Sequence, residues 1–137
     1  MTTPLGITVQ LDTTFAQAVQ RTREVLKAEG FGILTEVDLQ ATFREKLGRE
    51  FPPYLILGAC NPPLAFRALS AEPQVGLMLP CNVTVEARPA GGVVVRMVDP
   101  TILMSAGMLG ASPALSEVAS DARVRLERAA RALGGRG

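Results

Sequence analysis

The stretch CNVTVEARPAGGVVVRMVD, residues 81–99, decides the fold class of this 137-residue chain. Residues 81–88 alternate between apolar and polar side chains, which is the period of a β-strand with one buried face. The apolar face carries Cys81, Val83 and Val85, and the polar face carries Asn82, Thr84 and Glu86. Residues 89–92, Pro-Ala-Gly-Gly, supply a tight turn, and residues 93–99 form a second strand. The stretch therefore predicts an antiparallel β-hairpin.

Three more strands are predicted before the hairpin, and helices separate them. The strands are expected at residues 5–11, 31–37 and 54–60, and the helices at residues 15–29, 39–47, 62–70 and 113–133. The order β-α-β-α-β-α-β-β-α predicts a single α+β domain over residues 1–137. We expect a mainly antiparallel five-stranded sheet with helices packed on one face. If the second to fifth strands meander and the first pairs with the fifth, the first helix is a right-handed crossover.

Each predicted helix is preceded by a residue type that caps helices. The expected N-caps are Thr14, Asp38, Asn61 and Ser112. In the second helix, apolar residues recur at helical spacing, and we expect Leu39, Phe43 and Leu47 to face the core. Gly30 and Gly48 are expected to end the first two helices.

The composition narrows the classes of function. A net charge of +1 gives no reason to expect nucleic acid or an anionic membrane surface as a partner. The chain has no His, which excludes Ser-His-Asp and Cys-His catalysis and His-ligated metals within one chain. Its apolar runs are far shorter than a membrane helix needs, and residues 1–6 lack the pattern of a signal peptide. We therefore expect a cytoplasmic protein with no membrane partner.

Cys60-Asn61-Pro62 stands at the predicted junction of the third strand and the third helix. A structural interpretation suffices for Asn61 as the N-cap and for Pro62 at the first helical position. A functional interpretation uses the same geometry. A cysteine just before a helix N-terminus feels partial positive charge, which would lower the pKa of Cys60 and make its thiol reactive. Backbone N–H groups at the same place could dock an anionic ligand group.

Cys81-Asn82 opens the fourth strand, beside the third strand in the expected sheet. The structural interpretation makes Cys81 a small core residue and Asn82 part of a polar row. The functional interpretation needs Cys81 close to Cys60, where the two thiols could form a disulfide, a thiolate pair or two metal ligands. Two cysteines alone make an incomplete zinc site, so we expect no metal and no cofactor. A permanent disulfide is disfavoured in a reducing cytoplasm.

Residues 100–111 form an apolar connection that contains Met104 and Met108, with Gly107 and Gly110 making it pliable. One interpretation is ordinary core packing, with Met as a gap filler. The other is a loop that covers a pocket or is buried by a second subunit. A connection of this length with so much apolar content is unusual if it is merely solvated.

Three segments resemble a known family. They are Gly58-Ala59-Cys60-Asn61-Pro62, Leu79-Pro80-Cys81-Asn82 and Asp99-Pro100. Together with the first strand and helix they resemble the small prokaryotic family catalogued as domain of unknown function 302. The resemblance implies a compact α+β domain similar to a single copy of the TATA-binding-protein-like fold, and a homodimer. It implies no activity. The fold analogy does not carry DNA binding with it, because the sheet would offer only Arg88 and Arg96.

Three hypotheses for function follow. The leading one is a homodimeric domain that binds a small ligand or partner near Cys60, Asn61, Cys81 and Asn82. The second is a thiol-dependent redox or sulfur-handling protein, in which Cys60 is the attacking thiolate and Cys81 the resolving thiol. The third is a structural or interaction module whose cysteines only fill space.

Overall fold

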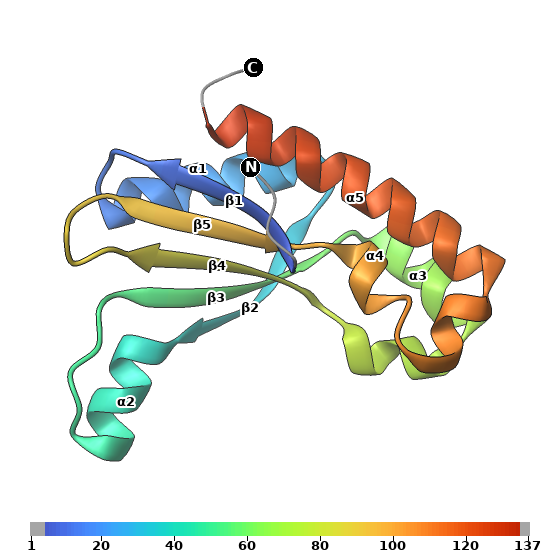
Figure 1. Cartoon of the computed structure of the whole chain (residues 1–137), viewed down its shortest axis with the longest axis horizontal. Helices are drawn as coiled ribbons and strands as arrows, with labels where there is room; N and C mark the ends of the chain where they lie inside the picture. The colour runs from blue at the N-terminus through green and yellow to red at the C-terminus, as the bar shows by residue number, and fades with distance from the viewer. Residues whose placement is uncertain (1–4, 135–137) are drawn as a thin grey trace.

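The predicted hairpin lies at the middle of the molecule. In a computed structural model that describes residues 5–134, β4 (Cys81–Ala87) pairs antiparallel with β5 (Val93–Val98). Both belong to one five-stranded sheet with the order β1-β5-β4-β3-β2 (Figure 1). The other strands are β1 (Gly6–Leu11), β2 (Gly32–Asp38) and β3 (Tyr54–Cys60).

Every pairing in this sheet is antiparallel. The second to fifth strands meander, and the first strand pairs with the fifth, so the predicted strand order is confirmed. The α+β fold class is confirmed with it. β1 and β2 are the two edges of the sheet and run parallel to each other, as the alternating directions of the strands between them require.

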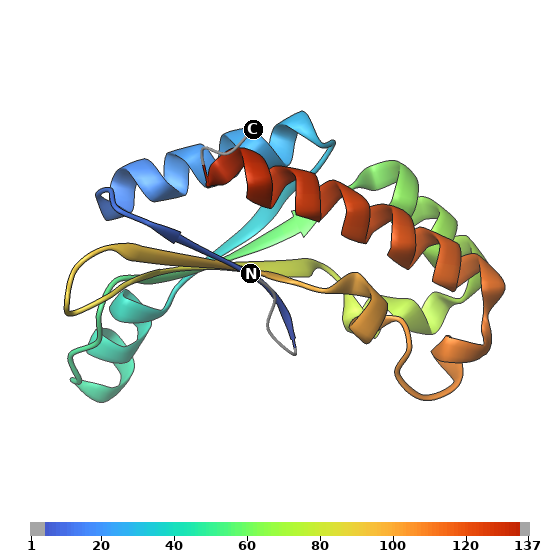
Figure 2. The same ribbon diagram turned by 45° about the horizontal axis from the view of Figure 1, so that its top comes forward.

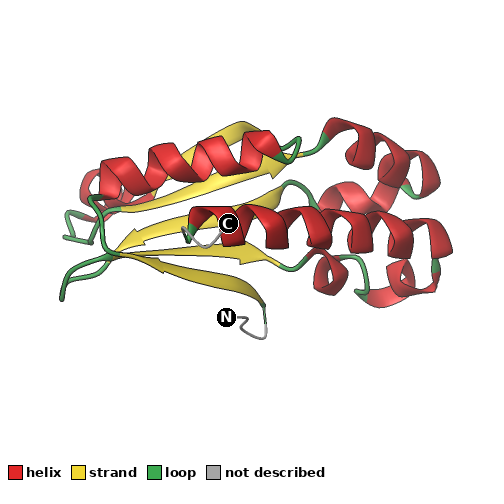
Figure 3. Cartoon of the chain, turned by 90° about the horizontal axis from the view of Figure 1, so that it is seen from above, coloured by secondary structure: helices red, strands yellow, loops and turns green. Residues whose placement is uncertain are grey.

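Two helices cover one face of the sheet, α1 (Phe15–Ala28) and α5 (Pro113–Leu133), and α3 (Pro62–Ala71) packs against α5 beyond the end of the strands. Figure 2 shows α1 and α5 above the strands, and Figure 3 shows them lying side by side. The core lies between these helices and the sheet. Its fully buried members include Leu26, Leu57, Val83, Val95 and Leu126.

The remaining long helix, α2 (Leu39–Leu47), lies apart from the other three (Figures 1 and 2). None of its residues is buried, and the Leu47 side chain is 64% exposed. The expectation that Leu39, Phe43 and Leu47 face the core is therefore wrong. Because α2 follows an edge strand, it packs beside the start of β3 instead, where Phe43 meets Phe51 edge to face at 5.0 Å between ring centroids.

The four predicted N-caps are confirmed. The side chains of Thr14, Asp38, Asn61 and Ser112 each accept a hydrogen bond from the backbone N–H three residues on. Gly30 and Gly48 follow α1 and α2 with positive φ angles, as expected. Three short helices complete the fold: η1 (Pro73–Met78), α4 (Pro100–Leu103) and η2 (Gly107–Ala111). None of the helices within residues 5–134 is long and apolar enough to span a bilayer.

Candidate functional site

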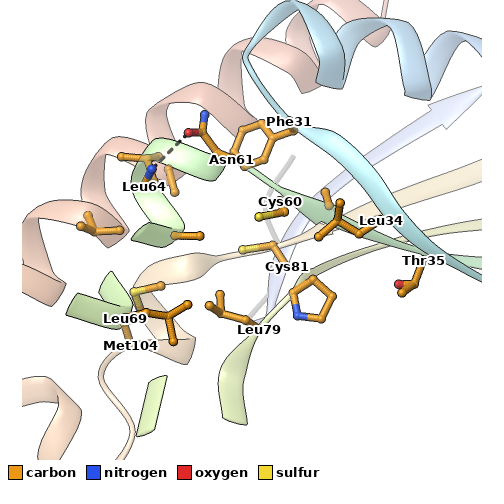
Figure 4. A pocket seen from close by; sticks show the side chains of 15 residues that line it. Phe31, Leu34, Thr35, Cys60, Asn61, Leu64, Leu69, Leu79, Cys81 and Met104 are labelled. Atoms are coloured by element: carbon orange, nitrogen blue, oxygen red, sulfur yellow. Dashed lines mark hydrogen bonds between the residues drawn. The ribbon is translucent and has the colours of Figure 1, made fainter. Parts of the chain in front are cut away.

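A cavity of about 310 Å³ lies where the end of β3 and the start of β4 meet α3 and α5 (Figure 4). Its wall joins residues that are distant in sequence. Phe31 comes from the segment before β2, Leu64 from α3 and Val118 from α5. None of the residues that line it is charged, and nearly all present carbon or sulfur. A cavity of this size and composition is typical of a site for a small apolar molecule.

Cys60 and Cys81 both line this cavity. Cys60 is the last residue of β3, and Cys81 is the first of β4, where it pairs with Ala59. Simple alternation along the strands would place the two side chains on opposite faces of the sheet. The cavity lies at the end of the sheet, however, and both sulfur atoms are turned toward it (Figure 4). Both residues are free thiols.

Burial raises the pKa of the Cys60 thiol above its usual value. Burial, and to a smaller extent the nearby Cys60, raises the pKa of Cys81 to about 11. The expectation that the helix N-terminus lowers the pKa of Cys60 is therefore wrong. Asn61 uses its own side chain to satisfy a backbone N–H of that terminus, and the remaining surroundings of the thiol are apolar. Both thiols are neutral at pH 7.

Asn61 forms part of the cavity wall and links two helices. Its side-chain oxygen accepts from the Leu64 N–H at 3.3 Å, and its amide nitrogen donates to the Glu29 carbonyl at 3.3 Å. Arg125 of α5 donates to the same carbonyl at 3.4 Å. Gly30 allows this approach, because a Cβ there would lie 2.8 Å from the Asn61 amide nitrogen. Asn61 thus holds the end of α1 to the start of α3.

Asn82 lies elsewhere. It is exposed, does not line the cavity and pairs in register with Gly58 of β3. Three of the four candidate residues are therefore brought together, and the fourth is not. On the polar face that Asn82 shares, Arg96 is paired with Glu86 at 2.6 Å, so this cation is already neutralised.

The apolar connection after β5 also reaches the cavity. Met104 is buried and lines it, while Met108 is 70% exposed on η2. Met104 therefore agrees with the interpretation in which this segment covers a pocket. Several other lining residues were not candidates in the sequence, notably Phe31, Leu34 and Thr35. The sequence around these residues does not mark them as site residues, because only the tertiary fold brings β2, α3 and α5 together.

Within residues 5–134, no three or more His, Cys, Asp or Glu side chains gather where they could hold a metal ion. The sulfur atoms of Cys60 and Cys81 and the amide of Asn61 are the most chemically distinctive groups at the cavity. The arrangement can enclose and orient an apolar molecule against two thiols.

Comparison with known proteins places the chain in a family. Residues 7–133 match the model described as domain of unknown function DUF302, and the chain belongs to this family. A crystal structure of an uncharacterized conserved DUF302 protein from Bacillus stearothermophilus is similar, with 34% sequence identity and a TM-score of 0.81. The similarity covers 93% of this chain and 96% of that one. No curated protein matches. The resemblance drawn from the cysteine-bearing segments is thereby confirmed.

Proposed function

We propose that this member of the DUF302 family binds a small molecule in the cavity at the end of β3. The observation that carries the proposal is a cavity of about 310 Å³ whose wall includes Cys60, Asn61 and Cys81. This pocket opens to solvent and its wall is almost entirely apolar, so a molecule that filled it would remove apolar surface from water. A bound molecule would recover the dispersion contacts that the wall otherwise lacks.

The test compares three forms of the chain for a molecule carried through purification. Ala65 lines the cavity from α3 and is only half-buried, so Ala65→Leu would reduce the space without overfilling the core. Ala71→Leu makes the same exchange at an exposed position of the same helix. Each protein is denatured and extracted with organic solvent, and the extract is analysed by mass spectrometry.

We expect one compound in near-stoichiometric amount from the wild type and from Ala71→Leu, and much less from Ala65→Leu. Thermal melts show whether each variant is folded. Identical extracts from all three folded proteins would contradict the proposal and leave the structural or interaction module as the better hypothesis.

A second candidate, thiol-dependent redox chemistry, has one observation in its favour, which is that both thiols line the same cavity. The raised pKa values oppose it, because the thiolate is the attacking species. Alkylation by iodoacetamide in Cys60→Ser and Cys81→Ser variants separates the two thiols. A Cys60 that reacts faster than a free cysteine at pH 7 would favour redox chemistry over simple binding.

We also propose that the chain forms a homodimer through the β2 edge. Six of the seven residues of β2 are exposed, and an edge strand offers backbone groups that a second strand can pair. Val37 on β2 and Leu47 on α2 add exposed apolar area beside that edge. A second copy would cover this apolar area.

Light scattering at micromolar concentration tests the dimer. We expect twice the chain mass for the wild type and a shift toward the monomer for Val37→Lys. Leu77→Lys changes an exposed apolar residue on η1 and serves as the control that leaves the mass unchanged. A wild type that is entirely monomeric would contradict the proposal.

A further inference from the structure

We infer that the molecule bound in the cavity is uncharged and mainly apolar, with roughly ten to fifteen non-hydrogen atoms. This inference rests on the proposed function and names the class of its ligand.

The wall offers no charge to an ionic ligand. None of the lining residues is acidic or basic. One cation, Arg125, lies beside Asn61: its guanidinium is 3.9 Å from the position that a Cβ on Gly30 would take. Arg125 is already engaged, because it donates to the Asp121 carboxylate at 2.8 Å and to the Glu29 carbonyl at 3.4 Å. An anionic group entering the cavity would lose its water without gaining a partner, which is costly.

The polar groups of the wall are largely committed to the protein. The Asn61 side chain accepts from Leu64 and donates to the Glu29 carbonyl. The two thiols are neutral and weak as hydrogen-bond partners. Thr35 alone adds a hydroxyl, and it lies at an exposed position of β2. A ligand rich in hydrogen-bonding groups would leave most of them unsatisfied, so the wall favours carbon skeletons.

The volume bounds the size. An apolar cavity of about 150 Å³ binds benzene, so a space of about 310 Å³ accommodates a compact organic molecule of roughly ten to fifteen non-hydrogen atoms. The exposed side chains of Leu34 and Leu69 stand at the wall as well, which keeps the rim apolar. A bicyclic aromatic molecule fits these limits.

A matched pair of probes tests the inference on the intact chain. Naphthalenesulfonamide is uncharged at pH 7, whereas naphthalenesulfonate has nearly the same shape and carries a full negative charge. The chain contains no Trp and one Tyr, so naphthalene fluorescence reports binding with little interference. Each probe is titrated into the wild type, Ala65→Leu and Ala71→Leu.

We expect the sulfonamide to bind the wild type and Ala71→Leu at least about tenfold more tightly than the sulfonate does. Its binding should weaken at least about tenfold in Ala65→Leu, because that side chain occupies the cavity. If the two probes bound with equal affinity, and Ala65→Leu weakened the binding of both, the inference that the ligand is uncharged would be overturned. The proposal that the cavity binds a ligand would still stand. Binding of neither probe, or binding that Ala65→Leu does not alter, would overturn the inference and count against the proposed function too.

Discussion

The two ends of β3 differ although the chain builds them from similar parts. α2 precedes this strand and α3 follows it, and each helix begins at a side-chain cap, Asp38 or Asn61. α3 buries Leu64 and Ala68 against the core, whereas α2 buries nothing. A cap and an apolar spacing therefore specify a helix. Whether that helix packs against the core depends on where the strand before it lies in the sheet.

The largest expected effect separates the apolar residues of the two helices. Leu64→Ala should cost about 3 kcal/mol of unfolding free energy, because it empties a buried site that is only 6% exposed. Leu47→Ala, at a site 64% exposed, should change it by less than about 0.5 kcal/mol. Urea unfolding followed by circular dichroism measures both. Similar losses of unfolding free energy in the two variants would mean that the Leu47 side chain of α2 is packed in solution. That result would contradict the difference between α2 and α3.

The second prediction concerns alkaline pH at the α3 end. The pKa of Cys81 is raised from 9.0 to about 11 in the folded chain, so the folded state keeps its proton where the unfolded state loses it. The contribution of this thiol to stability should therefore be fully present below its unfolded pKa of 9.0 and fall by about 2 to 3 kcal/mol as the pH rises through about 11. Cys81→Ala should reduce this fall, as urea unfolding at each pH would show. If the wild type and Cys81→Ala lost equal stability at alkaline pH, the loss would come from titratable groups other than Cys81.

The smallest expected contrast is between the two caps. Asn61→Ala should cost about 2 kcal/mol, because this buried amide makes two hydrogen bonds, to Leu64 and to Glu29. Asp38→Ala should cost about 1 kcal/mol, since it removes one exposed cap. Thermal unfolding of both variants gives the order. A larger loss for Asp38→Ala would show that α2 contributes more than its exposure suggests.

The sequence was informative where local rules decide the outcome. Alternation in residues 81–88 and the turn at 89–92 predicted the hairpin, and the four caps were found from residue type alone. The strand order followed from connection rules that permit few arrangements. Membership of the family was recognisable because the cysteine-bearing segments are specific.

The sequence was misleading where long-range packing decides. The apolar spacing of α2 predicted a buried face, but this helix packs only beside the start of β3 and none of its residues is buried. For Cys60, the helix N-terminus predicted a lowered pKa, whereas burial of the thiol raises it. The cavity itself could not be predicted, because Phe31, Met104 and Val118 come together only through the tertiary fold.

The pairing of β1 with β5 has a consequence for how the chain is made. Gly6 pairs with Val98, so the first strand waits for more than 90 residues to be synthesised before its partner exists. Contacts this far apart along the chain slow folding, since a long loop must close before they form. The meander from β2 to β5 can assemble first on the ribosome. β1 can join the sheet only after β5 has been synthesised.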